Sequence, residues 1–400
     1  MDKEYGPATR PAKRRPIDAA VFRSALLAHF DRHRRPLPWR ADRNPYRVTV
    51  SEFMLQQTRV ETVGPYYARW LQRFPDWDAL AAAPLDDVLL EWEGLGYYSR
   101  ARNLHRTARA VRERYGGELP ADPAALRTLP GVGEYTAGAV ASIAFGRPVP
   151  AVDGNVRRVL ARLLDLARPT PAQLRREAAR LLDPDRPGDH NEAMMELGAT
   201  ICTPRTPRCE ECPVAAWCAA LAAGTVAERP GRRPRRRPVP RVDYATLVGI
   251  DPAGRILLAK RPEEGLLAGM WEFPSGEVRD SEQPGAGHTG SQGSDAVSAV
   301  VASALRHLRI FGLDGRPTAL LARVRHAFTP LRATYHPVVV RFDQEASPIP
   351  ECEAAGNAEP LAPAPEHAWI RPAEIAGYAL PVAQQKIARL VDEWMRKAGD

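Results

Sequence analysis

Four of the five cysteines in this chain lie between residues 202 and 218, in the pattern C-x6-C-x2-C-x5-C. Thiolates this close together can surround one inorganic centre, and their soft sulfur atoms select an iron–sulfur cluster or zinc over hard cations. Structural zinc sites usually present two close pairs of ligands, whereas only one such pair is present here. Disulfides need an oxidising compartment, which no other feature indicates. We therefore expect a loop folded around an iron–sulfur centre, with zinc as the alternative, held by Cys202, Cys209, Cys212 and Cys218.

Length and charge narrow the class of protein. A chain of 400 residues is long enough for two or three domains, and its hydrophobic fraction of 44% is ordinary for a globular protein. The formal net charge of +8 suits a polyanionic partner. No apolar signal region follows the charged N-terminus, and no apolar run has the length of a membrane span. We expect a cytoplasmic monomer that associates with the nucleoid through DNA and has no membrane partner.

Changes in composition divide the chain into four parts. Residues 1–16 are charged and contain prolines, which predicts a disordered tail, whereas residues 17–223 show helical spacing of apolar side chains. Residues 224–243 hold seven arginines interleaved with prolines, a composition that cannot bury a core and indicates a linker. Residues 244–400 change to the alternating pattern of strands, which predicts a smaller mixed α/β domain.

Within this last part, strands are expected at residues 244–250, 255–259 and 335–342. Residues 279–295 and 344–366 are rich in Gly, Pro, Ser, Ala and acidic side chains, which predicts disordered insertions.

A glycine-rich turn lies between two helical stretches of the first domain. In the segment Leu129 to Ala137, Pro130 ends one helix, and Gly131, Val132 and Gly133 form a tight hairpin before the next helix. Exposed backbone amides and the start of a helix attract an anion, so such a turn can hold a DNA phosphate without reading the base sequence. The pattern predicts a helix–hairpin–helix element.

The distribution of lysine limits the chemistry of this domain. No lysine occurs between Arg14 and Ala259, and the hairpin carries a tyrosine at position 135. Strand cleavage by an imine mechanism needs a side-chain amine. Without such an amine in this stretch, the domain is not expected to cut a strand by that mechanism.

Two carboxylates are candidates for acid–base chemistry. Cleavage of a glycosidic bond, for example, needs an acid to protonate the leaving group and a negative charge to stabilise the sugar cation. Glu52 lies in an apolar helical stretch, where burial would favour its protonated form. Asp153 precedes an amphipathic helix and could stay ionised at its N-terminus. Considered alone, Glu52 could be a surface residue and Asp153 only a helix cap.

The chain as a whole resembles the MutY family of adenine DNA glycosylases, within the endonuclease III superfamily. The cysteine pattern is similar to the iron–sulfur loop that closes the glycosylase domain of that superfamily. Bifunctional members carry lysine where this chain has Tyr135, so the resemblance implies a monofunctional enzyme that removes a base and leaves the strand intact. The other matching segments are Leu37–Arg40, Ser51–Val60, Gly94–Leu104, Leu129–Ala137, Val152–Val156 and Asn191–Cys202.

The resemblance implies a [4Fe-4S] cluster on the four cysteines, and double-stranded DNA with adenine opposite 8-oxoguanine or guanine as the partner. It implies that Glu52 protonates adenine at N7, while Asp153 stabilises the oxocarbenium ion or forms a transient adduct. Tyr135 and Asn155 would orient this acid pair. The remaining contacts to adenine and DNA would come from Leu37, Trp39, Arg40, Gln57, Tyr97, Gly131, Val132, Gly133 and Glu192, although Trp39 and Tyr97 could instead pack in the core.

The C-terminal part is similar to the Nudix-like, lesion-recognition domain of that family. Residues 269–276 (GMWEFPSG) match its early segment, but the glutamate run of a Nudix hydrolase does not follow, so no pyrophosphohydrolase activity is expected. Phe328 and Thr329 correspond to the loop that would read 8-oxoguanine. Pro330 stands where the family usually has histidine and lacks an N–H donor, which leaves the strictness of that preference open.

Two other functions stay open at this point. A related glycosylase could act on another mispair, such as thymine opposite guanine. A non-catalytic DNA-binding protein could use the cluster as a redox sensor, although binding alone would not need Glu52, Asp153 and Tyr135.

Overall fold

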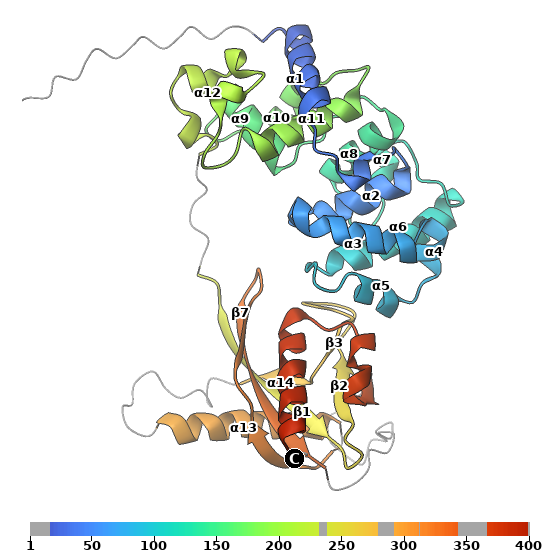
Figure 1. Cartoon of the computed structure of the whole chain (residues 1–400), viewed down its shortest axis with the longest axis vertical. Coiled ribbons are helices and arrows are strands. Elements are labelled where there is room, and N and C mark those ends of the chain that lie inside the picture. Colours follow the sequence, from blue (N-terminus) through green and yellow to red (C-terminus); the bar gives the residue numbers. More distant parts are fainter. Residues whose placement is uncertain (1–16, 232–237, 279–291, 312, 343–365, 399–400) are drawn as a thin grey trace, which may run out of the picture. The chain divides into compact units, whose positions relative to one another are not determined.

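A computed structural model of the chain describes residues 17–231, 238–278, 292–311, 313–342 and 366–398 (Figure 1). The predicted tail, the centre of the linker and most of the two predicted insertions lie outside these residues. Helix α13 begins at Gln292, inside the segment 279–295 that was predicted to be disordered.

Contacts divide the chain into two compact units, which are described separately. The first comprises Met1–Ala83 and Arg102–Arg235, and the second Pro84–Ala101 and Arg236–Asp400. The sequence placed Pro84–Ala101 within the helical domain, whereas its contacts group it with the C-terminal part. Two polar contacts show why: the Lys260 ammonium binds Asp86 at 2.9 Å, and the Leu380 amide donates to Glu93 at 2.9 Å.

The first unit consists of helices, as predicted. Prolines follow the capping residues Asn44 and Asp122, whose side chains accept from Arg47 and Ala125 amides. Its elements, of which α6 begins in the second unit, are α1 (Ala19–His33), η1 (Pro38–Arg40), α2 (Pro45–Leu55), α3 (Val60–Arg73), α4 (Trp77–Ala82), α6 (Ser99–Tyr115), α7 (Pro123–Leu126), α8 (Glu134–Phe145), α9 (Gly154–Leu163), α10 (Pro171–Leu181), α11 (Pro187–Thr200), η2 (Cys209–Glu211), η3 (Ala215–Trp217), α12 (Ala219–Ala222) and η4 (Val226–Glu228).

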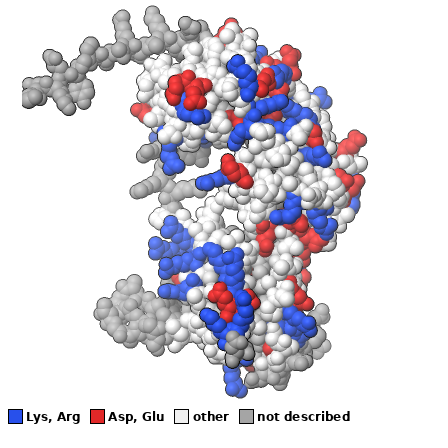
Figure 2. Space-filling model, viewed as in Figure 1, with Lys and Arg blue, Asp and Glu red and all other residues white. Residues whose placement is uncertain are grey.

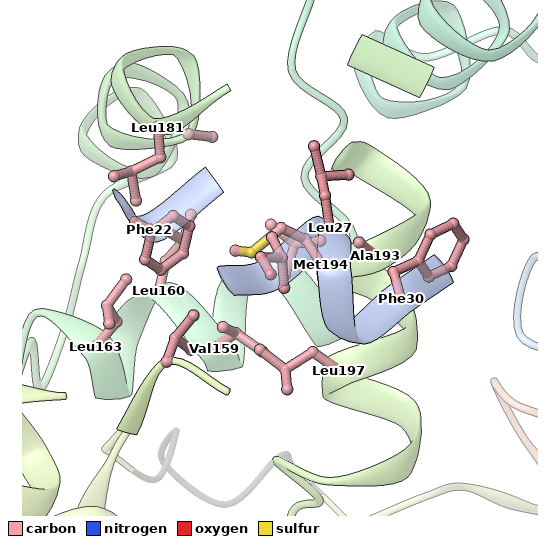
Figure 3. Close-up of a cluster of buried hydrophobic side chains, with 14 of the residues drawn as sticks. Phe22, Leu27, Phe30, Val159, Leu160, Leu163, Leu181, Ala193, Met194 and Leu197 are labelled. Atoms are coloured by element: carbon pink, nitrogen blue, oxygen red, sulfur yellow. The ribbon is translucent and has the colours of Figure 1, made fainter. Parts of the chain in front are cut away.

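The core of this unit lies where α1, α9, α10 and α11 meet (Figure 3). Phe22, Leu160 and Leu181 are fully buried there, each contributing roughly 1.5–3 kcal/mol through burial of its side chain. This packing holds the N-terminal ends of α9 and α11 in fixed positions, and both ends carry predicted site residues.

The second unit is a mixed sheet with strand order β3-β2-β1-β7-β5, covered by α13 on one face and α14 on the other. Strands β1 and β7 are parallel along their whole length, and β6 and β5 follow one another beside β7. The elements are α5 (Leu85–Glu91), β1 (Arg241–Ile250), β2 (Ile256–Lys260), β3 (Trp271–Glu272), β4 (Ser275–Glu277), α13 (Gln292–Ile310), β5 (Arg316–Leu320), β6 (Val324–Ala327), β7 (Arg332–Arg341), β8 (His367–Ile370), η6 (Pro372–Gly377) and α14 (Val382–Ala398).

The three strands expected from the sequence correspond to β1, β2 and β7, each within a few residues of the predicted bounds. Among the helices that the structure describes, none combines the length and apolar character needed to cross a bilayer.

Candidate active site

A cavity of about 710 Å³ in the first unit is lined by residues from α2, α8, α9, α11 and η1. It brings together side chains that are far apart in the sequence. Of the predicted site residues, the cavity wall contains Leu37, Trp39, Arg40, Glu52, Gln57, Tyr135, Asp153, Asn155 and Glu192. Trp39 also packs edge-on against Tyr67, so it lines the cavity and belongs to the core at once.

Glu52 is the buried acid of this cavity. Helix α2 runs through the unit with Phe53 and Met54 in the core, so its neighbour Glu52 retains only 6% of its exposed surface. Burial, together with the negative charge of Asp153, raises the pKa of Glu52 to about 7, against a hydrogen bond from Tyr135 that lowers it. Its Oε2 atom is buried and has no hydrogen-bond partner. A carboxyl in this environment is protonated for much of the time near neutral pH.

Asp153 lies in a different environment. It caps α9, and its Oδ1 accepts from the Val156 amide at 2.7 Å while Oδ2 accepts from the Asn155 side-chain amide at 2.9 Å. Burial raises the pKa of Asp153, and these two hydrogen bonds oppose the increase because they stabilise the ionised form. The cavity therefore holds one carboxyl with an unpartnered oxygen and one with two donors.

A line of hydrogen bonds runs from Asp153 to the cysteine loop. Beyond Asn155, the Arg158 guanidinium donates to Asn155 Oδ1 at 2.9 Å, to the Gly198 carbonyl at 2.7 Å and to the Cys202 carbonyl at 2.8 Å. The sequence reasoning missed Arg158. Its position could have indicated the contact, because it lies three residues after Asn155 and residues three apart on a helix are neighbours.

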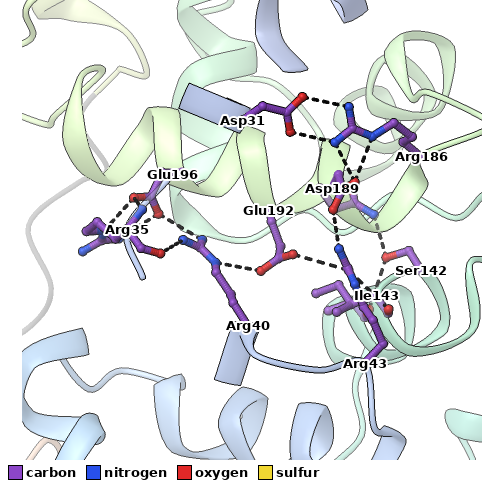
Figure 4. A network of polar contacts seen from close by, with 12 residues as sticks. Asp31, Arg35, Arg40, Arg43, Ser142, Ile143, Arg186, Asp189, Glu192 and Glu196 are labelled. Carbon is purple, nitrogen blue, oxygen red and sulfur yellow. Dashed lines mark hydrogen bonds and ion pairs between the residues drawn. The ribbon is translucent and has the colours of Figure 1, made fainter. Parts of the chain in front are cut away.

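Arginines and carboxylates form an ion-pair network along α11 (Figure 4). Arg40 binds Glu192 at 2.8 Å and Glu196 at 3.0 Å, so the predicted pair of Arg40 and Glu192 is in direct contact. Arg35 binds Glu196 at 2.6 Å, and Arg43 approaches Glu192 at 3.4 Å. Although burial opposes it, Arg35 and Arg40 lower the pKa of Glu196. The sequence reasoning missed Arg35, Arg43 and Glu196, because their partners lie more than 140 residues away.

The predicted hairpin precedes α8. Gly131 has φ of 74°, and a Cβ there would lie 2.7 Å from the Asn103 Cβ, so only glycine fits without strain. The Thr107 hydroxyl donates to the Pro130 carbonyl at 2.8 Å and holds the turn against α6. The Val132 amide is used inside the turn, by the Leu129 carbonyl. The exposed amides of Gly131 and Gly133 have no acceptor among the residues described, which leaves them available to a phosphate.

Gln57 and Tyr97, the two residues expected to enter the duplex, share an unusual backbone. Their φ angles are 58° and 49°, a left-handed conformation that non-glycine residues adopt at a cost and that recurs at functional sites. Both side chains are exposed, Tyr97 to 42%. In the second unit, the Tyr97 hydroxyl lies 3.1 Å from the Thr329 hydroxyl. Phe328 packs edge-on against His326, so the predicted loop is held next to β6.

The four cysteines line one small cavity behind α9, together with Arg162. All four are free thiols, and burial raises the pKa of Cys209 and Cys218 and raises that of Cys212 to about 12. In the described residues, no three His, Cys, Asp or Glu side chains are placed to share a single metal ion. An iron–sulfur cluster differs from a single metal ion because each of its irons is bound by a different thiolate. Such a cluster needs four thiols arranged around one cavity.

Arg162, on α9, contacts this loop and is only 2% exposed. Its guanidinium donates to the sulfur of Cys202 at 3.3 Å and to the carbonyls of Thr203 at 2.7 Å and Pro204 at 3.1 Å. It also donates to the carbonyls of Val226 and Arg229, both at 3.1 Å. The thiols, the buried positive charge and the closed loop fit an anionic iron–sulfur cluster.

Comparison with known families gives three matches along the chain. A model described as an HhH-GPD superfamily base excision DNA repair protein matches residues 50–184. The iron–sulfur binding domain of endonuclease III matches residues 202–218, and a NUDIX domain matches residues 245–390. These matches confirm the predicted order of a helical domain, an iron–sulfur loop and a Nudix-like α/β domain.

Curated relatives match over most of the chain. The adenine DNA glycosylase of Mus musculus is 37% identical over 433 residues, covering 94% of this chain and 79% of that protein. The corresponding protein of Rattus norvegicus is 36% identical over 435 residues, covering 95% and 79%. The adenine DNA glycosylase of Mycolicibacterium smegmatis is 46% identical over 211 residues, covering 51% of this chain and 72% of that protein.

Proposed function

Since the chain belongs to the adenine DNA glycosylase family, and is a base excision repair N-glycosylase for adenine mispairs with a [4Fe-4S] cluster, we propose that it removes adenine opposite 8-oxoguanine or guanine and leaves an abasic site. The observation that carries the mechanism is the carboxyl pair of the cavity. One member, Glu52, has a raised pKa and an unpartnered buried oxygen, and the other, Asp153, accepts two hydrogen bonds.

In the proposed reaction the Glu52 carboxyl gives its proton to N7 of the extruded adenine. The bond between C1′ and N9 breaks with its electron pair going to adenine, and positive charge develops on the sugar. The Asp153 carboxylate stabilises that charge, held in place by Asn155 and the Val156 amide. A water molecule then bonds to C1′ and passes a proton to the ionised Glu52, which restores the acid.

Adenine would be recognised by the wall opposite the acids. Arg40 and Arg43 fix the orientation of Glu192, so its carboxylate can accept from a donor on the extruded base. Trp39 contributes an aromatic surface to the same cavity. The cluster would be held by Cys202, Cys209, Cys212 and Cys218, where it supports the loop that Arg158 and Arg162 bind.

The loop of Phe328 and Thr329 is the proposed reader of the base opposite adenine. Thr329 is exposed and offers a hydroxyl, whereas Pro330 offers no N–H donor. On this basis we propose that 8-oxoguanine is preferred over guanine through Thr329 and its neighbour Tyr97, whose hydroxyls are 3.1 Å apart.

The test is base release by Glu52→Gln on duplexes with adenine opposite 8-oxoguanine, with alkali added afterwards to cut abasic sites. The amide keeps the shape but cannot deliver the proton, so we expect the single-turnover rate to fall about 10²–10⁴-fold with little change in DNA affinity. A rate within a few-fold of wild type would remove Glu52 from the mechanism. A parallel panel with thymine opposite guanine would reveal activity on the other mispair.

A further inference from the structure

Four arginines lie together on one face of the sheet in the second unit, and the mechanism uses none of them. We name this surface the arginine face and define it as Arg241, Arg323, Arg325 and Arg332, all of which are exposed. Figure 2 shows basic side chains gathered on the part of this unit where β1 and β7 begin.

The register of the strands places these side chains side by side. In the parallel pair of β1 and β7, Arg241 lies opposite Arg332. Beside β7, Arg325 lies opposite Thr334, which points to the same face as Arg332 because side chains two apart on a strand share a face. Arg323, two residues before Arg325, continues the series. Neighbouring strands are about 4.8 Å apart, so Arg241 and Arg332 begin side by side on the same face.

Among the described residues, this face lies beyond the end of α13, on the side of the sheet that α13 packs on. Further along the same strands, Ala245, Leu247 and Val338 are buried against α13. On β7, Ala333 and Tyr335 point the opposite way, into the core beneath α14. The arginines therefore lie beyond the part of the sheet that α13 covers, and their side chains are exposed among the described residues.

Within the residues that the structure describes, the positive charge of the face has no carboxylate partner. Elsewhere in this unit arginines are paired, as Arg255 is with Asp251 and Arg261 with Glu272. In the described part of the protein no carboxylate pairs with the arginine face. Its rows contain one acid, Asp243, which binds His336 at 2.8 Å. Like charges placed opposite each other on a sheet destabilise it, so a polyanion would relieve a repulsion already built into the fold.

We propose that the arginine face binds phosphates of duplex DNA, on the strand that carries the base opposite adenine. The choice of strand rests on the proposed function, because Arg325 and Arg332 flank the loop of Phe328 and Thr329 in one hairpin. Phosphate contacts position a protein without reading sequence. The Thr334 hydroxyl, between Arg325 and Asp243, adds a neutral donor in the middle of the face.

The experiment compares two double variants that lose the same charge. The first variant, Arg241→Ser with Arg332→Ser, removes two of the four arginines of the face. The control, Arg389→Ser with Arg396→Ser, removes two exposed arginines from α14. Dissociation constants for undamaged duplex, and for duplexes with adenine opposite guanine or 8-oxoguanine, are measured against salt concentration. Each lost phosphate contact lowers the slope of log affinity against log salt by about 0.9, so we expect a decrease near two for the face and little for the control.

Neutral methylphosphonate linkages then identify the strand. The wild-type protein should lose affinity when they are placed in the strand opposite adenine, and the face variant should lose much less. Equal slopes for the two double variants would overturn the proposal. If the serine variant folds poorly, judged by its thermal unfolding, Arg241→Lys with Arg332→Lys must keep the wild-type slope, since the charge is retained. Binding of undamaged duplex involves no base release, so an inactive wild-type enzyme would overturn the proposed function and leave this slope unaffected.

Discussion

At the scale of single residues, the cavity separates two carboxyls by what surrounds them. Glu52 is buried and has an oxygen without a partner, whereas Asp153 accepts from the Val156 amide and the Asn155 side chain. Burial raises the pKa of both carboxyls, and hydrogen-bond donors lower it again by stabilising the ionised form. Asp153 therefore caps the N-terminus of α9 and is, by the same contacts, held in place for its proposed role in catalysis.

The raised pKa of Glu52 predicts how base release depends on pH. A general acid is active only when protonated, and its pKa is about 7. The single-turnover rate should therefore be highest below neutral pH and fall tenfold per pH unit well above it. In Glu52→Gln the residual rate should lose this descending limb. A wild-type rate that stays level through the alkaline range would contradict the assignment.

The same shift predicts an effect on stability. Because the folded-state pKa lies above the ordinary value of 4.5, the folded protein holds this proton more tightly than the unfolded chain. The stability that this binding contributes is present below about pH 4.5 and is lost as pH rises through about 7. Above that range Glu52→Gln should increase the free energy of unfolding by roughly 1–3 kcal/mol, measured by denaturant titration, and near pH 5 much less.

We predict that the residue at position 135 decides whether the strand can be cut. The wild-type enzyme should leave abasic DNA unbroken until alkali is added, and borohydride should trap little covalent complex, because no lysine lies between Arg14 and Ala259. Tyr135→Lys places an amine beside Glu52 and should create some trapping, limited by how readily that amine loses its proton in the cavity. Efficient trapping by the unaltered protein would contradict the prediction and direct attention to Lys260 or the N-terminal amine.

At the scale of elements, α9 joins the active site to the cysteine loop. Its first turn carries Asp153 and Asn155, and its buried side carries Arg158 and Arg162, which both donate to carbonyls of the loop. One helix therefore orients the proposed catalytic carboxylate and also binds the carbonyls of the cysteine loop.

Arg162→Met should release the loop, because the carbonyls of Thr203, Pro204, Val226 and Arg229 lose their bond to Arg162, at about 1–3 kcal/mol for each one that water cannot reach. We expect fewer irons per chain after purification and faster iron loss to a chelator. Arg162→Lys, with three donors and no planar fork, should be intermediate. Arg176→Met on α10, whose side chain is 74% exposed, serves as the control. Unchanged iron content and chelation rate in Arg162→Met would show that the loop does not depend on this cation.

At the scale of the whole molecule, the proposed catalytic residues and the loop proposed to read the lesion lie in different compact units. Both carboxyls and all four cysteines belong to the first unit, and the loop of Phe328 and Thr329 belongs to the second. Deleting residues 244–400 should therefore weaken the preference for 8-oxoguanine over guanine more than it weakens adenine release. Because Pro84–Ala101 groups with the deleted part, iron content must first show that the remainder is folded. A folded truncation with the original preference would contradict this division.

Features that depend on a few neighbouring residues could be predicted from the sequence. Asn44 and Asp122 as helix caps, the glycine turn at 131 and the cysteine spacing all act within about one turn of chain, so the residues that cause them stand together in the sequence. The alternation of β1 and β7 and the burial of Glu52 were visible for the same reason, since periodicity reports the face that is covered.

The tertiary structure decided which distant residues meet. Arg35 binds Glu196 across 161 positions, and Arg162 collects carbonyls from Thr203 to Arg229, partners that no local pattern connects. The arginine face exists because Arg241 and Arg332 share a register, which depends on how two strands 91 residues apart pair. Ion pairs and sheet registers are chosen by the packing of whole elements, and that packing depends on many weak contacts acting together rather than on any short segment of sequence.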